Sequence, residues 1–267
     1  MSLTLESVVQ AVEMLEKQGR STEVFFRNDD VDVVEDNLIE LLDVFGGAGV
    51  PLSLAIIPAR LTDDAIRSIG DYLDRFPYLF EPHQHGFQHV NHELTGRKCE
   101  FGPSRTYAQQ RADITAGHRL LKQAFGPHLA PIFTPPWNRC TRETFAVLDE
   151  IDFRILSRDR SEAPILGYRL RETSVTLDIF SWKHGPRLRP ADAIARDLCD
   201  QMRSGDSVGI MLHHKVMNRE AFQLIRQILG ILRFPQVGLR TIATLRQWQL
   251  KLNTSAKPDS AVERIQQ

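Results

Sequence analysis

The densest group of side chains capable of chemistry is the run 83–92, which holds four of the nine histidines in the chain. Neutral imidazole is the commonest protein ligand for metals such as zinc. His85 and His89 are four residues apart, a spacing that puts two ring nitrogens on one face of a helical turn. The spacing favours a metal site. A polar surface loop rich in histidine is the alternative that these ten residues alone leave open.

Two carboxylates and a distant histidine could complete such a site. Asp29 and Asp30 follow the apolar strand pattern at 23–27, and His213 follows another apolar stretch. A catalytic metal typically has three protein ligands and one open position. Adjacent side chains on an extended chain point in opposite directions, so one aspartate could bind the metal while the other acts as general base on water. His213 could protonate the leaving group, and together these groups predict amide or ester hydrolysis.

Strand and helix patterns alternate about seven times along the chain, which predicts a parallel sheet with helices outside it. In a parallel barrel the carboxyl ends of all strands open on one face, where active sites lie. The predicted strands cover 23–27, 51–58, 78–84, 131–134, 153–157, 175–182, 207–212 and 239–242. The predicted helices cover 4–18, 36–48, 62–76, 105–125, 141–150, 190–204, 218–231 and 243–251.

Unusual polar side chains recur directly after these strands, so we expect residues remote in sequence to converge on one face. Trp137 could line a substrate groove with its flat apolar ring, or pack beneath it. The other candidate substrate-binding residues are Asn138, Arg139, His184 and His214, with His214 as an alternative to His213.

Length and composition predict one domain over 1–252 and a polar, disordered tail over 253–267. A closed α/β barrel of about 250 residues commonly forms one domain. The net charge of −1 gives no electrostatic footprint for nucleic acid. No apolar run approaches the ~18 residues of a membrane span, so none is expected.

The chain has three cysteines, Cys99, Cys140 and Cys199, which are odd in number and widely scattered. This pattern argues against a disulfide framework and for a reducing compartment. The first residues also lack the basic end and apolar stretch of a secretory signal. The expected location is therefore the cytoplasm, and the thiols are expected to be bystanders.

Four short motifs in this order resemble those of the polysaccharide deacetylase family, the NodB-like carbohydrate esterases. They are Asn28-Asp29-Asp30, His85-x-x-x-His89, Thr134-Pro135-Pro136-Trp137 and Leu212-His213. The resemblance implies a distorted (β/α)7-type barrel of parallel strands. It also implies that Asp29 is the base, that Asp30, His85 and His89 bind the metal, and that His213 is the catalytic acid.

The chain departs from the family pattern at three points. Gly86 stands where the second motif usually has serine or threonine, and Thr134 stands where the third motif usually has an arginine that supports the base. Arg139 or Arg27 could serve instead. The aspartate and tryptophan of the fourth motif have no clear match, and Asp159 and Ser181-Trp182 are the candidates.

The main hypothesis is a metal-dependent hydrolase, with zinc as the expected ion, that removes an acyl group from an N-acylated amino sugar or a related carbohydrate precursor. The missing third-motif arginine keeps a metal-independent amidohydrolase acting on a small cyclic amide or ureide as an alternative. A carbohydrate-binding barrel without turnover is the other alternative.

Overall fold

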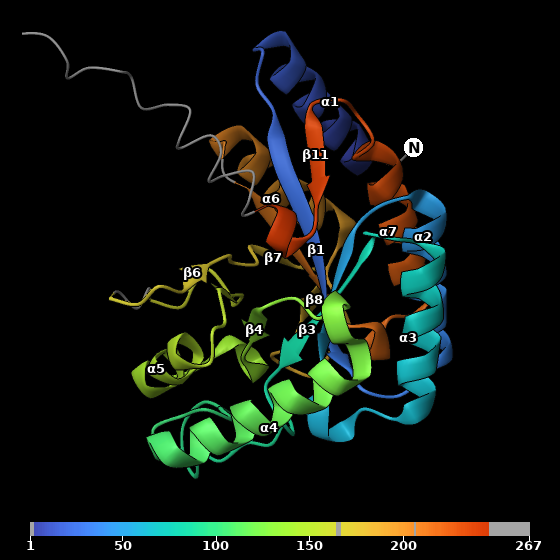
Figure 1. The fold of residues 1–267 in the computed structure, drawn as a ribbon. Coiled ribbons are helices and arrows are strands. Elements are labelled where there is room, and N and C mark those ends of the chain that lie inside the picture. Colours follow the sequence, from blue (N-terminus) through green and yellow to red (C-terminus); the bar gives the residue numbers. More distant parts are fainter. Residues whose placement is uncertain (1–2, 164–166, 206, 246–267) are drawn as a thin grey trace, which may run out of the picture.

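A curled parallel sheet forms the centre of the molecule, with helices outside it (Figure 1). The computed structural model describes residues 3–163, 167–205 and 207–245. The strands of the main sheet are β1 (Thr22–Val31), β2 (Leu52–Ile56), β3 (Phe80–His85), β4 (Ile132–Thr134), β5 (Ile155–Leu156), β6 (Arg171–Glu172), β7 (Leu177–Asp178), β10 (Val208–Leu212) and β11 (Val237–Arg240). The α-helices are α1 (Leu3–Lys17), α2 (Asp36–Ala48), α3 (Asp63–Arg75), α4 (Tyr107–Phe125), α5 (Arg142–Glu150), α6 (Ala191–Ser204) and α7 (Arg219–Ile231).

The strand order shows how the sheet curls into a distorted barrel. It runs β6-β5-β4-β3-β2-β1-β10-β7, every pair is parallel, and β11 pairs with the start of β1. The strands at the two ends of this order, β6 and β7, belong to one segment, 171–178. This segment pairs with β5 at its beginning and with β10 at its end, so it closes the curve. The predicted barrel of parallel strands is confirmed.

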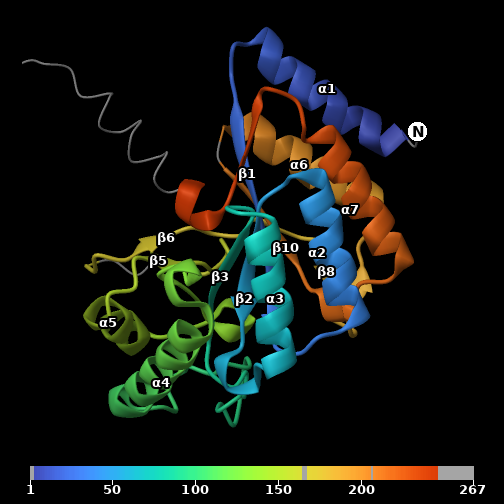
Figure 2. The ribbon, with the colours of Figure 1, turned by 45° about the vertical axis from the view of Figure 1, so that its right-hand side comes forward.

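Buried apolar side chains of the described residues form three clusters, one of which packs α4 and α5 against β4 and β5. The largest cluster of buried side chains packs the outer face of the sheet against the helices. Figures 1 and 2 show α2 and α3 side by side on one flank, and α4 packs against both α3 and α5. A smaller cluster fills the closed end of the barrel with side chains from several strands. It contains Phe25, Ile132, Ile155, Val175, Met211, Ile242 and Leu245.

Most predicted elements are present, with shifts at their ends. The first strand is longer than predicted and runs through Asp29 and Asp30 to Val31. The predicted strand 175–182 is broken after Asp178, where the short strand β8 (Phe180–Ser181) begins a hairpin with β9 (Arg187–Leu188).

The predicted tail, 253–267, lies outside the described residues. None of the helices in the described part of the chain is both long and apolar enough to cross a membrane. All three cysteines are free thiols, as expected.

Candidate active site

Three predicted metal ligands meet at the carboxyl ends of β1 and β3. The Oδ1 atom of Asp30 lies 3.1 Å from Nε2 of His85 and 3.1 Å from Nε2 of His89. One candidate ligand atom from each residue lies within 4.8 Å of the other two. Ligands placed about 2.1 Å from a tetrahedral zinc ion are about 3.4 Å apart, so one small cation fits between these atoms.

The donor set also fits a cation chemically. The Nδ1 atom of His85 lies 3.0 Å from the carbonyl oxygen of Thr134, which can only accept, so the ring proton is on Nδ1. This leaves the lone pair of Nε2 directed at Asp30, as in metal sites where the second ring nitrogen is held by a carbonyl. Burial raises the pKa of the Asp30 carboxyl, but when both imidazoles are protonated in the absence of an ion, their hydrogen bonds and charges outweigh burial and hold that pKa below its usual value.

A bulge in β1 brings two neighbouring carboxylates to the same pocket. The pairing of β1 with β2 shifts between Asn28 and Val31, so β1 has one residue more than β2 over this stretch. Asp30 occupies the left-handed region, with φ of 65°. Because the bulge breaks the alternation of side chains, both Asp29 and Asp30 line the pocket.

A buried arginine fixes the orientation of Asp29. Arg27 is fully buried and donates two hydrogen bonds to the Asp29 carboxylate, from Nε at 2.7 Å and from NH2 at 2.8 Å. It also bonds Ser157 Oγ at 2.9 Å and Asn138 Oδ1 at 2.7 Å. Burial raises the pKa of Asp29, but the positive charge of Arg27 outweighs this and lowers it below its usual value. Asp29 is therefore a carboxylate at neutral pH.

Arg27 rather than Arg139 is thus the arginine that contacts Asp29. The guanidinium of Arg139 lies 3.6 Å from Glu162 and 3.0 Å from the carbonyl of Lys98, and it lines another part of the pocket.

His213 lies in the same pocket, beside an aspartate and a tryptophan. The Trp182 ring packs edge-on against the His213 ring, with centroids 4.6 Å apart. Asp178 accepts hydrogen bonds from Trp182 Nε1 at 2.7 Å and from the Phe180 amide at 2.8 Å. Burial raises the pKa of Asp178, and the proximity of His213 counteracts part of that rise. This arrangement favours Ser181-Trp182 over Asp159 as the match to the fourth motif.

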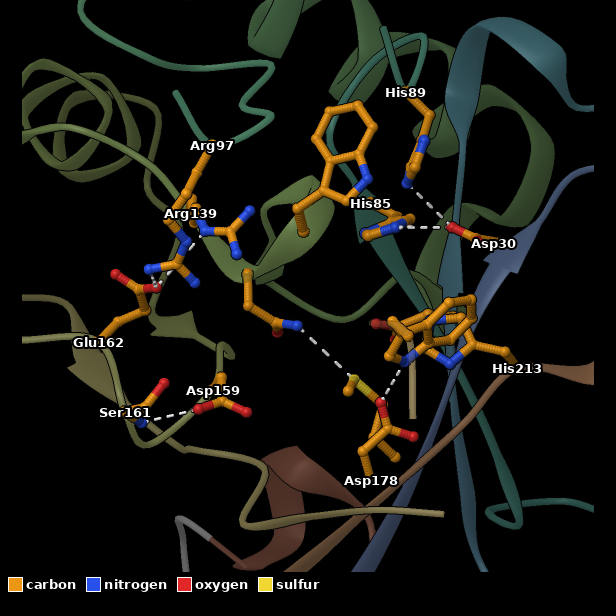
Figure 3. A pocket seen from close by; sticks show the side chains of 15 residues that line it. Asp30, His85, His89, Arg97, Arg139, Asp159, Ser161, Glu162, Asp178 and His213 are labelled. Atoms are coloured by element: carbon orange, nitrogen blue, oxygen red, sulfur yellow. Dashed lines mark hydrogen bonds and ion pairs between the residues drawn. The ribbon is translucent and has the colours of Figure 1, made fainter. Parts of the chain in front are cut away.

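The pocket encloses about 310 Å³ between these groups and a wall of charged side chains. Figure 3 shows the metal-ligand candidates on one side, and Arg97, Arg139 and Glu162 on the other. Arg97 lies 3.1 Å from Glu162, and Asp159 lines the same wall. The Trp137 ring packs against the His89 ring, with centroids 4.5 Å apart and the two planes inclined at 55°. It lines the pocket, as do Asn138 and Arg139.

Two candidate substrate-binding residues lie away from this pocket. His214 is fully buried and bonds the Asn28 side chain at 3.0 Å. Side chains alternate along a strand, so when His213 points into the barrel, His214 points outward toward α2. His184 is exposed, in the turn between β8 and β9. Neither residue is among those that line the pocket, so their role in substrate binding stays a prediction.

Sequence analysis missed Asp178 and named Arg27 only as one of two options. A signal for Arg27 was present, because Phe25, Arg27 and Asp29 share one face of a strand through their spacing of two. The signal for Asp178 was a lone carboxylate within an otherwise apolar strand pattern.

Comparison with solved structures identifies the architecture. A candidate polysaccharide deacetylase from Mycobacterium smegmatis superposes with a TM-score of 0.63 at 16% identity, over 93% of this chain and 96% of that one. The chain has the polysaccharide deacetylase fold. A family 4 acetyl xylan esterase from Clostridium thermocellum, solved with a cobalt ion, gives a TM-score of 0.58 at 15% identity, over 85% and 92% of the two chains.

The polysaccharide deacetylase fold also includes a CE4 family pseudoenzyme from Bacillus anthracis, which matches with a TM-score of 0.51 at 14% identity, over 85% of this chain and 65% of that one. No protein-family model and no curated protein sequence matches the chain. At these identities the similarity establishes the fold, and any activity must be argued from the site.

Proposed function

We propose that this protein is a divalent-metal-dependent hydrolase that removes an acyl group, with acetyl as the first expectation, from an N-acylated amino sugar or a related compound. The observation that carries the proposal is the cluster of Asp30, His85 and His89 beside a buried carboxylate and a further histidine in one pocket. Zinc is the expected ion because two imidazoles and one carboxylate form a donor set that zinc favours.

Each residue of the site has a role that follows from its environment. Asp30, His85 and His89 would hold the ion, which would supply Lewis acidity at the substrate carbonyl and lower the pKa of water. Asp29 is ionised and held by Arg27, so it can accept the proton of the attacking water. The C–N bond of the amide then breaks as the departing nitrogen takes a proton from His213.

Arg27 bears on the metal-independent alternative. That alternative was motivated by Thr134 standing in place of the usual arginine. The guanidinium of Arg27 contacts Asp29 directly, so the carboxylate has an arginine partner on its own strand, β1, in place of one at the position of Thr134 on β4. Arg27 therefore supplies the positive charge beside the base that the third motif lacks. The absence of the third-motif arginine no longer favours the metal-independent alternative.

The dimensions of the pocket favour a short substrate. A volume of about 310 Å³ is at the lower end of the range, roughly 300–1,000 Å³, that is usual for small-molecule sites. The rings of Trp137 and Trp182 line it and offer flat apolar faces against which a sugar ring can stack. The charged side chains on the opposite wall offer hydrogen-bonding groups to hydroxyls.

The experiment that tests the proposal is acetate release from N-acetylglucosamine and its short oligomers, measured with added zinc and with a strong chelator. We expect release with zinc, loss with the chelator, and recovery when zinc is returned. His85→Ala and Asp29→Asn should both lack activity, but only His85→Ala should fail to retain zinc. Release that persists in chelator would favour the metal-independent amidohydrolase. Sugar binding without release would favour the carbohydrate-binding barrel.

A further inference from the structure

The loop between β3 and α4 contains a buried carboxylate that does not line the pocket. Glu100 is fully buried, and its side chain accepts hydrogen bonds from three consecutive backbone amides. Its Oε1 atom lies 2.7 Å from the Gln88 nitrogen and 3.0 Å from the His89 nitrogen, and Oε2 lies 3.2 Å from the Phe87 nitrogen. Glu100 therefore binds the backbone of the loop that leads from His85 to His89.

Gly86 provides the space that this carboxylate occupies. A Cβ atom on Gly86 would lie 2.2 Å from Glu100 Oε2 and 2.5 Å from Pro136 Cγ, both far inside van der Waals contact. The φ angle of Gly86 is 56°, which favours glycine. The glycine that departs from the family pattern is thus the residue that lets Glu100 reach the loop amides.

The conformation that Glu100 stabilises is a strained one. His89 has φ of 58°, in the left-handed region that is unfavourable for a residue other than glycine. The stretch from Gly86 to His89 is not helical, so helical hydrogen bonds do not hold it. The amide of His89 itself donates to Glu100, and hydrogen bonds to a charged acceptor are about twice as strong as neutral ones.

We propose that Glu100 is a positioning residue for the metal centre, which rests on the proposed function. By binding the amides of Phe87, Gln88 and His89, it holds the His89 backbone so that Nε2 lies opposite Asp30. A carboxylate is required because three converging N–H groups need two acceptor oxygens, and a neutral amide at this place would turn one NH2 group toward them.

The first test measures zinc affinity by competition with a chelating dye. Glu100→Gln should bind zinc about 10–100-fold more weakly than the unchanged protein, the loss typical of residues that orient metal ligands. Glu100→Asp keeps the negative charge but places it one methylene group farther from the loop amides. Its zinc affinity should lie between those of Glu100→Gln and the unchanged protein. The matched control is Glu93→Gln, because Glu93 is in the same loop and its carboxylate accepts hydrogen bonds from the amide and hydroxyl of Ser104. Its contacts with Asn91 are made by the Glu93 backbone, which this substitution keeps.

A second measurement separates this inference from the proposed function. Hydrogen exchange of peptides covering 86–92, in chelated protein, should be faster in Glu100→Gln than in Glu93→Gln, whether or not the protein turns over any substrate. Excess zinc should restore most of the kcat of Glu100→Gln, which a general loss of structure would not allow.

Unchanged exchange in 86–92 or unchanged zinc affinity in Glu100→Gln would overturn the positioning role. If the unchanged protein releases no acetate but these effects are present, the proposed function fails while the positioning role stands. If Glu100→Gln does not fold, Glu100→Asp carries both measurements.

Discussion

Replacing Arg27 with methionine should expose how strongly the base depends on its buried partner. The change keeps an unbranched side chain but removes the guanidinium that bonds Asp29. It also removes the donors to Ser157 and Asn138. Asp29 would remain almost fully buried, with burial no longer opposed by a guanidinium.

The cost should be large, because removal of one member of a buried ion pair leaves an uncompensated charge. Such changes typically reduce the free energy of unfolding by about 3–5 kcal/mol. Hydrolysis should also fall by about 10²–10⁴-fold, the usual contribution of a general base, because Asp29 loses its orientation.

The pH dependence has a definite sign. In the unchanged protein the pKa of Asp29 is below its usual value, so the pair stabilises the fold at neutral pH, and this stabilisation is lost as the pH falls through the lowered pKa. Without Arg27, burial would be opposed only by the charges of His85 and His213, so the pKa of Asp29 should rise. The destabilisation caused by Arg27→Met should therefore be smaller at about pH 5 than at about pH 8.

The assay is urea unfolding of chelated protein, with Arg27→Met, Asp29→Asn and the double variant forming a cycle. The double variant should recover much of the stability lost in Arg27→Met, because no buried charge is left alone. Glu40→Gln, which breaks the exposed pair with Arg226, should cost no more than about 1 kcal/mol. A cost below about 1 kcal/mol for Arg27→Met, or no recovery on adding Asp29→Asn, would refute the reasoning.

Three further results are expected. His89→Ala should weaken zinc binding by more than about 100-fold in equilibrium dialysis, because it removes a ligand and not merely a residue that orients one. His92→Ala should leave zinc binding unchanged. Gly86→Ala should lower the free energy of unfolding by about 1–3 kcal/mol in urea titration, because of its positive φ and the steric clash of a Cβ atom. Burial lowers the pKa of His83 to about 3 and that of His214 to about 4, so NMR should show both rings neutral at about pH 5. The unfolded chain takes up protons at these two histidines below about pH 6.5, whereas the folded protein does not. The free energy of unfolding should therefore fall as the pH drops below about 6.5.

The convergence of the site could be predicted from the sequence because it follows from topology. Asp30, His85 and His213 are at or beside the carboxyl ends of three different parallel strands, and such ends share one face of a barrel. No side-chain detail was needed for that inference. The same rule placed Trp137 and Asn138 near the pocket.

What escaped prediction depends on local backbone geometry. The four-residue spacing of His85 and His89 suggested a helical turn, but His85 ends a strand and His89 returns from a loop with positive φ. The partner of that loop, Glu100, is separated from it by a long irregular stretch that carries no periodic signal.

The alternation of side chains along a strand would have predicted two further features of the site from the sequence. Applied to 207–214, it would have sent His213 and His214 to opposite faces of the sheet. It would equally have placed Arg27 beneath Asp29 in the barrel interior.

The extra residue in β1 interrupts the pairing with β2, but it also brings two carboxylates into one pocket. The two residues between Asn28 and Val31 are Asp29 and Asp30, so deleting either one would let the first two strands pair without interruption but would remove one of the two carboxylates from the cavity. A redesign that removes this bulge would be expected to yield a barrel that is more stable but has no hydrolytic activity. The irregularity is therefore a feature to preserve when the protein is engineered for heat resistance.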